Sequence, residues 1–263
     1  MDFTNWKWMN ENKILINNGD IVSVSAAIYD DKNKSPKAKI NIVGGTLSAN
    51  DGINVSYDIL EVSGGKIVST AASRDSYVLR CGSGAECNIN DDIVLEAPKA
   101  SGIYATGTLN LNRATVIGGA ENAYGIYLNG ANLTLNGATI EAKGINANAI
   151  VTNGGNLNIT VNDATIEAGN VGLYLTGSNK LRMYGGNVLA KTYAIYQDGG
   201  SCDTILGDGA KTDVSITNPT LEGGVYGLYS KAGTLTFNSG ILKGYNKAYS
   251  GTFNNIRSGY EIF

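Results

Sequence analysis

The sequence contains no histidine, and this absence removes several kinds of active site. Ser–His and Cys–His nucleophilic systems need an imidazole base, and common zinc sites use histidine ligands. The chain also lacks the GxSxG and GxxxxGK[ST] motifs, and it has no GxGxxG in a strand–helix context. We therefore expect no catalytic residue, no metal ion and no cofactor.

Proline and cysteine are scarce, with three residues of each, whereas glycine occurs 35 times. Many glycines and few prolines, in a chain rich in Asn, Thr, Ile and Leu, predict short strands joined by tight turns. Cys81 and Cys87 are close enough in sequence to close a short disulfide loop, which would leave Cys202 without a partner. Three cysteines are too few to indicate a redox compartment.

Long apolar runs and strong charge are absent as well. No stretch of about 18 apolar residues occurs, so we expect no membrane insertion by this segment. The formal net charge is −3 and no run of Lys or Arg stands out, which gives nucleic-acid binding no electrostatic support. Residues 1–10 lack the basic region and apolar run of a signal peptide. An excised mature domain of a secreted or cell-surface protein fits this pattern better than a cytosolic protein does.

One unit repeats along the chain. The segment 124–142 (YGIYLNGANLTLNGATIEA) recurs at 101–118 (SGIYATGTLNLNRATVIG), 148–168 (NAIVTNGGNLNITVNDATIEA), 171–190 (VGLYLTGSNKLRMYGGNVLA) and 226–244 (YGLYSKAGTLTFNSGILKG). Each unit contains three strand-like pieces separated by turn residues. The second piece alternates aliphatic, polar and aliphatic residues, as a strand with one buried and one wet face does.

Aliphatic anchors mark the three pieces. The first piece has its anchor at Ile28, Ile53, Val78, Ile103, Ile126, Ile150, Leu173, Ile195 and Leu228. The second piece is the triplet at 40–42, 60–62, 109–111, 133–135, 157–159, 181–183, 214–216 and 235–237. The third piece has its anchor at Leu47, Ile67, Ile93, Val116, Ile140, Ile166, Val188, Leu221 and Ile241.

A unit of this length with three strands and no helical pattern predicts an all-β solenoid. Leucine-rich repeats carry one strand per unit, and propeller blades need about 40 residues. Parallel coils place equivalent residues directly over one another, about 4.8 Å apart, which explains why each offset keeps its residue type. We predict one parallel β-helix domain over residues 1–263, with about ten coils and three short strands per coil.

The domain divides into three parts. Residues 1–20 are predicted to form an N-terminal cap, 21–244 the repeated coils, and 245–263 a partial coil that suggests a longer native chain. Two segments break the period: residues 198–213 lengthen one coil by about ten residues, and residues 30–39 form a charged loop. Insertions in solenoids project from one side, where they either bind partners or are tolerated as surface loops.

An outward tyrosine column is the best candidate for a functional surface. If the first-piece anchors point inward, the next residue points outward, and this position holds Tyr104, Tyr127, Tyr174, Tyr196 and Tyr229, with Val151 interrupting. Further tyrosines precede the anchor at positions 124, 193 and 226. A column of phenols can hold sugar rings by apolar contact and hydroxyl hydrogen bonds. Alternatively, the rings only stabilise neighbouring coils through same-face pairs.

Two groups of carboxylates invite other functions. Glu141 and Glu167 occupy the same place in adjacent coils, so their carboxylates could lie about 5 Å apart, as in retaining glycosidases. Both belong to the repeated phrase ATIEA, however, and a solvated surface or a weak cation site are the alternatives. Asp91 and Asp92 with Glu96 suggest calcium ligands, although no EF-hand loop is present and a turn explains them equally well.

The pattern GIYxxGxLTLNGATIEA resembles the pectin-lyase-like superfamily of right-handed parallel β-helices, in its adhesin and autotransporter-passenger branch. The resemblance covers residues 28–244. It implies a right-handed coil and a secreted or surface-displayed bacterial rod that binds polysaccharide or host partners. Catalytic members carry a calcium-binding Asp cluster with basic residues, or NTD, DD, GHG and RIK motifs. GHG is impossible without histidine and RIK does not occur, so their catalytic residues are not carried over.

Three functions follow as hypotheses. The first is a non-catalytic extracellular adhesin-like protein that binds glycans or a host surface through the tyrosine column. The second is a polysaccharide lyase or glycoside hydrolase that uses carboxylates on one face. The third, a self-associating scaffold, would use exposed coil ends.

Overall fold

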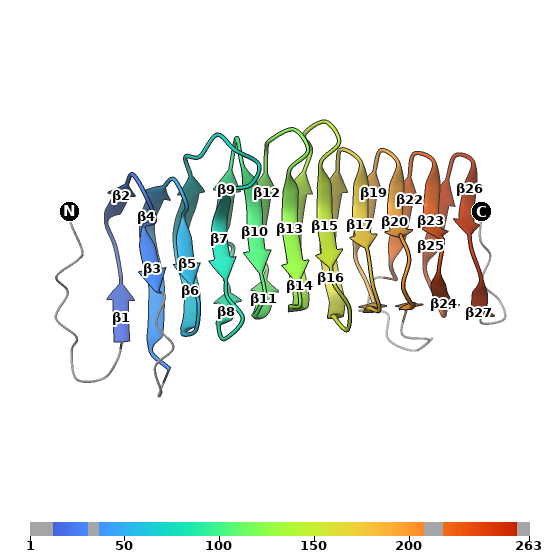
Figure 1. Cartoon of the computed structure of the whole chain (residues 1–263), viewed down its shortest axis with the longest axis horizontal. Coiled ribbons are helices and arrows are strands. Elements are labelled where there is room, and N and C mark those ends of the chain that lie inside the picture. The colour runs from blue at the N-terminus through green and yellow to red at the C-terminus, as the bar shows by residue number, and fades with distance from the viewer. Residues whose placement is uncertain (1–12, 31–36, 208–217, 257–263) are drawn as a thin grey trace.

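The computed structural model describes residues 13–30, 37–207 and 218–256 (Figure 1). This part of the chain contains strands and no helix, and it forms a parallel β-solenoid of about nine turns. The turns follow one another along a single axis, with β1 at one end of the rod and β27 at the other (Figure 1). The predicted all-β class is confirmed, and the structure is consistent with a right-handed β-helix.

Each turn has three faces. The first face is a ten-stranded sheet in which every strand pairs with the equivalent strand of the next turn. Its strands are β3 (Ile28–Asp30), β5 (Ile53–Val55), β7 (Tyr77–Cys81), β10 (Ser101–Ala105), β13 (Tyr124–Asn129), β15 (Asn148–Asn153), β17 (Val171–Leu175), β20 (Tyr193–Gln197), β23 (Tyr226–Ser230) and β26 (Lys247–Ser250).

The second and third faces share a 17-stranded sheet. The second face contains β1 (Lys13–Ile16), β8 (Glu86–Ile89), β11 (Thr108–Asn112), β18 (Lys180–Met183), β21 (Cys202–Leu206), β24 (Gly233–Phe237) and β27 (Phe253–Ile256). The third face contains β2 (Asp20–Ser23), β9 (Val94–Ala97), β12 (Thr115–Gly118), β19 (Asn187–Ala190), β22 (Thr220–Gly223) and β25 (Ile241–Gly244). Four bent strands of 11 residues run across both faces: β4 (Lys39–Ala49), β6 (Ile59–Ser69), β14 (Asn132–Ala142) and β16 (Asn158–Ala168).

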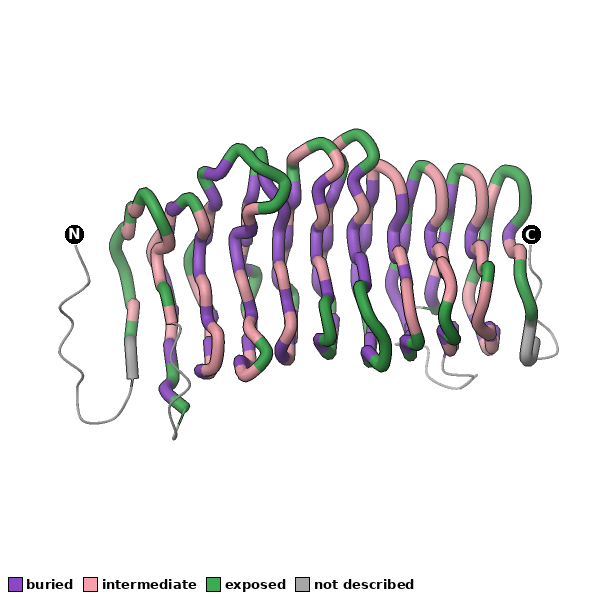
Figure 2. The backbone as a smooth tube through the Cα atoms, viewed as in Figure 1, coloured by how far each residue is buried: buried purple, intermediate pink, exposed green. Residues whose placement is uncertain are grey.

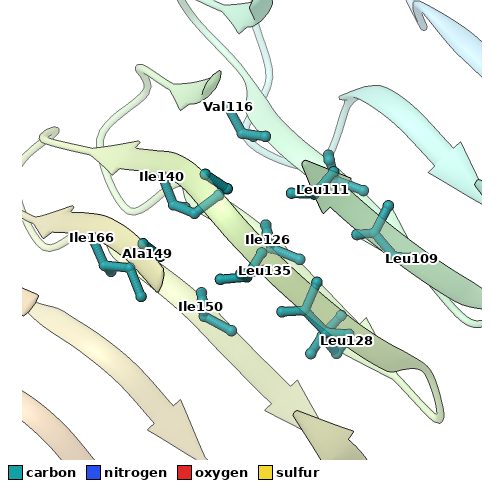
Figure 3. Packing of buried hydrophobic residues seen from close by; sticks show 14 of the residues in the cluster. Leu109, Leu111, Val116, Ile126, Leu128, Leu135, Ile140, Ala149, Ile150 and Ile166 are labelled. Carbon is teal, nitrogen blue, oxygen red and sulfur yellow. The ribbon is translucent and has the colours of Figure 1, made fainter. Parts of the chain in front are cut away.

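The core is a set of aliphatic stacks that run along the axis. Inward residues of all three faces meet there, as Leu111, Ile126 and Ile140 do in Figure 3. Buried positions alternate with more exposed ones along the strands from β4 onward, whereas the described residues of the first turn, with β2 and β3, include no buried one (Figure 2). Each fully buried aliphatic side chain contributes about 1.5–3 kcal/mol relative to an exposed one, so the stacks hold the turns together.

The structure corrects three predicted anchors, because residues beside the true anchor are also apolar. Leu79, not Val78, aligns with Ile53 and Ile103. On the third face the anchors are Leu95 and Leu242 in place of Ile93 and Ile241. Ile241 is outward and exposed, whereas Val78, within β7, and Ile93, just before β9, are buried.

The predicted second-face triplets also need correction. Ile159 and Val161 align with Leu133 and Leu135, so the triplet is 159–161 and not 157–159. The triplet 87–89 of β8 was missing from the prediction and aligns with 109–111. In the turn that contains β20, residues 204–206 of β21 align with 181–183, whereas the predicted triplet 214–216 lies outside the described residues.

The expanded coil begins later than predicted. Residues 202–206 form the regular strand β21, so the extra length falls between Leu206 and Thr220. Only residues 207, 218 and 219 of that connection are described. Most of the other insertion, residues 31–36, lies outside the described residues. At the start of the rod, residues 13–16 of the predicted cap form β1, which pairs in parallel with β4.

An asparagine ladder lines the corner between the second and third faces. Asn112 donates its side-chain N–H to Asn90, Asn136 donates to Asn112, and Asn162 donates to Asn136, each at 2.6 Å. One amide per turn therefore serves as both donor and acceptor and ties four successive turns together.

The turn that contains β20 and β21 has a polar interior. Gln197 is fully buried and donates from Nε2 to Thr204 Oγ1 at 2.6 Å. The Gln197 Oε1 atom has no hydrogen-bond partner. In the same turn Cys202 is a buried free thiol, whereas Cys81 and Cys87 are paired in a disulfide, as their spacing suggested.

Candidate functional site

The five predicted tyrosines lie in one column on the outside of the first face. Tyr104 is in register with Tyr127, and Tyr174, Tyr196 and Tyr229 follow one another in register. Val151 occupies the rung between Tyr127 and Tyr174 and is only 7% exposed. All five tyrosines are half-buried, because the neighbouring inward residue anchors each strand in the core. The structure therefore brings the predicted residues together, in two groups.

The first group, here called the N-terminal cluster, contains Tyr77, Tyr104, Tyr124, Tyr127 and Arg80. The rings of Tyr104 and Tyr127 are stacked with centroids 5.7 Å apart and planes 11° apart. Tyr77 and Tyr124 pack beside them at 5.4 and 5.1 Å. The Arg80 guanidinium carbon lies 4.7 Å from the Tyr77 centroid and 5.6 Å from that of Tyr104.

The second group, here called the C-terminal cluster, consists of five rings and one ion pair: Tyr174, Tyr193, Tyr196, Tyr226, Tyr229, Asp198 and Lys231. Adjacent ring centroids lie 5.0–5.8 Å apart. No ring contact joins Tyr127 to Tyr174, so the Val151 rung separates the two clusters within the described part of the chain.

Asp198 is the polar centre of the C-terminal cluster. Its carboxylate accepts hydrogen bonds from the hydroxyls of Tyr174 and Tyr196, the latter at 3.2 Å, and from Lys231 Nζ at 2.6 Å. The hydrogen bonds from Lys231 and Tyr174 hold the pKa of Asp198 below its usual value. Burial, with added effect from Asp198, raises the pKa of Tyr174 to about 12. The phenol thus stays protonated at neutral pH and acts as a donor.

Sequence reasoning missed four members of these clusters. Tyr77 is 6% exposed, and burial raises its pKa to about 12. Arg80 occupies the column position one turn before Tyr104, which the misplaced anchor at Val78 concealed. Asp198 and Lys231 are the first residues after β20 and β23. They meet only because these two strands stack on each other in neighbouring turns of the solenoid. The alternation of residues could have revealed Arg80, but not the ion pair.

The paired glutamates are in register, as predicted. Glu141 aligns with Glu167, while Leu189 and then Glu222 follow in the same column. Lys143 lies between the first two, with its Nζ atom 3.4 Å from Glu141 Oε2 and 2.7 Å from Glu167 Oε2. The hydrogen bond to Glu167 raises the pKa of Lys143. One ammonium group therefore bridges the two carboxylates and offsets part of their negative charge.

A shallow hollow of about 530 Å³ adjoins Glu167. Leu189, 52% exposed, lies in its lining together with Lys143, Lys191 and Glu222. It forms where the five-residue connection after β14 gives way to the two-residue connections after β16 and β19. The hollow is open, and its lining mixes both charge signs around the apolar side chains of Leu189 and two alanines.

The acidic residues near β9 do not come together. Asp91 and Asp92 adopt left-handed conformations in a turn, where both pair with Arg113. Glu96 instead pairs with Lys66 on the third face. No group of three or more His, Cys, Asp or Glu residues in the described ranges is placed to hold a metal ion.

No protein-family model, no curated protein and no solved structure matches this chain. Within the described residues there is no helix long and apolar enough to cross a membrane. The parallel β-helix thus rests on the structure itself, and its tyrosine face is the main clue to a function.

Proposed function

We propose that the chain is a non-catalytic, secreted or cell-surface bacterial protein of the adhesin-like, pectin-lyase-like β-helix type. It binds glycans or a host surface through the tyrosine column. The observation that supports this proposal is the placement of five tyrosines in register on one outer face. The proposal involves neither nucleic acid nor membrane insertion of this segment.

The hydroxyl groups of the C-terminal cluster favour binding over a purely structural role. In the described part of the chain, the hydroxyls of Tyr193, Tyr226 and Tyr229 have no hydrogen bond to another residue. A half-exposed phenol without an internal partner can donate to and accept from a sugar hydroxyl, while the ring edge contacts the apolar face of the sugar. Pairing across strands alone would need neither the hydroxyl nor the exposure.

A glycan array followed by titration calorimetry tests the proposal. We expect Tyr127→Ala and Tyr174→Ala each to weaken binding by roughly tenfold, since a well-placed ring contributes on the order of 1 kcal/mol. Tyr184→Ala is the matched control, because Tyr184 lies outside both clusters. Equal affinity of the wild type and both column variants would show that the column serves only the stacking of coils.

A polysaccharide lyase or glycoside hydrolase is the second candidate. It is favoured by the register of Glu141 with Glu167 and by the hollow beside Glu167. Its weakness is Lys143, which forms ion pairs with both carboxylates and occupies the space between them. Release of reducing sugar by the wild type, abolished in Glu141→Gln or Glu167→Gln, would establish this function in place of the first.

A further inference from the structure

Arg80 replaces a tyrosine in the outward column. It is in register with Tyr104 on one side and Asn54 on the other. Its guanidinium carbon lies over two rings, Tyr77 and Tyr104, whose planes are tilted by 59°. Two aromatic contacts hold the guanidinium group in one place at the outer surface, so a ligand would not have to order it.

Arg80 also differs from the other arginines of the described part of the chain. Arg74, Arg113 and Arg182 each pair with a carboxylate. Arg80 Nη2 donates to the backbone oxygen of Asp75 at 3.0 Å, and no carboxylate of the described residues lies within ion-pair distance of its guanidinium. A guanidinium group has five N–H donors, so most of those of Arg80 remain available.

Among the described residues, no group around Arg80 neutralises its positive charge. Tyr77 is a neutral phenol at neutral pH, and burial raises its pKa further, to about 12. Asp75, whose backbone oxygen accepts the Arg80 hydrogen bond, has its carboxylate in an ion pair with Arg74 at 3.6 Å. Tyr104 Oη accepts a hydrogen bond from Asn129 Nδ2 at 3.1 Å, which leaves the Tyr104 proton free to point outward.

We infer that Arg80 and Tyr104 form a binding site for a carboxylate-bearing sugar, an inference that rests on the proposed glycan-binding function. The planar guanidinium matches a carboxylate through two parallel hydrogen bonds, which a lysine cannot reproduce. The Tyr104 ring and hydroxyl then contact the sugar to which that carboxylate belongs. The C-terminal cluster lacks this capacity, because Asp198 already neutralises its only cation, Lys231.

Titration calorimetry with two matched ligands tests this site. The ligands are an oligomer of a hexuronic acid and its carboxyl-reduced counterpart of the same length. We expect the wild-type chain to bind the acidic oligomer about tenfold more tightly, as charge-assisted hydrogen bonds allow. Arg80→Gln should remove this preference while affinity for the neutral oligomer remains. Arg80→Lys should restore only part of it, because the two-point contact is lost.

Arg182→Gln is the matched control, since Arg182 lies on the second face and pairs with Asp203. Its affinities should equal those of the wild type, and the thermal midpoint of each variant shows that it is folded. Equal affinity of the wild type for both oligomers would overturn the inference and leave the proposed function standing. If neither oligomer nor any arrayed glycan binds, both fail. A polyglutamate of equal charge that binds as tightly would also contradict sugar recognition.

Discussion

The two halves of the rod differ in whether their buried polar side chains have hydrogen-bond partners. In residues 13–168, the buried polar side chains at positions 58, 69, 101 and 152 all have hydrogen-bond partners. In residues 171–256, Gln197 Oε1 and Ser239 Oγ are buried without one. Polar groups on the outside add a bond per turn, as in the asparagine ladder, whereas an unpaired carbonyl inside costs about 1–3 kcal/mol. The first half is therefore expected to be the more stable one.

Replacement of the buried polar pair in the second half should reduce this difference in stability the most. We expect the double variant Gln197→Leu with Thr204→Val to raise the free energy of unfolding by about 1–3 kcal/mol, because it removes an unpaired carbonyl at nearly constant volume. Leu175 and Leu181 occupy the equivalent positions one turn earlier, so aliphatic residues fit the stack. Urea denaturation measures the change, and hydrogen exchange in β20 and β21 places it in this turn.

The single variant Thr204→Val is the control for that pair. It leaves the Gln197 amide N–H without its acceptor, so stability should fall below that of the wild type. A double variant less stable than the wild type would show that the polar pair is needed in the stack, for example to fix the turn before the expanded connection.

In the first half, removal of a polar side chain from the asparagine ladder should lower stability, whereas removal of the buried polar pair should raise it. Asn136→Ala removes two hydrogen bonds, one to Asn112 and one from Asn162. We expect a loss of about 1–2 kcal/mol in the free energy of unfolding, measured by urea denaturation. Asn238→Ala is the matched change in the second half, where the side chain makes one bond to the Gly207 backbone oxygen at 3.1 Å. Its cost should be about half as large, and equal costs would mean that the ladder adds nothing beyond single bonds.

Periodicity predicted the three-faced coil, but not every register. Two of the misplaced positions share one cause, which is that inward apolar positions continue through the corners between strands. Ile93 and Leu157 are buried corner residues two positions before the true anchors Leu95 and Ile159. An aliphatic–x–aliphatic pattern therefore begins two residues before the true anchor. Only the pairing between strands decides which residue stands in the stack.

The residue before the first-face anchor misled the prediction in another way. Val78 occupies the position that Gly102 and Gly125 fill in the next turns. An added Cβ atom at Gly125 would lie 2.6 Å from Ala149 O and 2.7 Å from Ile140 Cγ2, so there is little room for a side chain at this position. The valine made this position resemble an anchor, which hid Arg80 from the column.

The members of the candidate site that recur at one offset of the repeat could be predicted from the sequence. Those that lie in the irregular connections could not. The tyrosines recur at one offset, so the alternation of inward and outward residues located them. The ion pair of Asp198 with Lys231 joins turns 33 residues apart in sequence, in connections that have no common pattern. The interaction of Lys143 with Glu141 and Glu167 likewise depends on side-chain placement across turns.

Ionisation of the tyrosines offers the finest test of the difference between the clusters. Tyr77 and Tyr174 both have a pKa of about 12, Tyr77 chiefly through burial and Tyr174 through burial together with Asp198. In both cases the folded chain holds its proton more tightly than the unfolded chain does. Their contribution to stability is therefore complete below pH about 10 and is lost as the pH rises towards about 12.

Asp198→Asn should separate the two tyrosines. It removes the negative charge that opposes the Tyr174 phenolate, so the pKa of Tyr174 should move down towards its usual value while that of Tyr77 stays near 12. Phenolate absorbance against pH measures the shift, with Tyr174→Phe identifying the Tyr174 component. An unchanged titration in Asp198→Asn would mean that burial alone governs Tyr174. The two clusters would then differ in Arg80 but not in how their phenols are held.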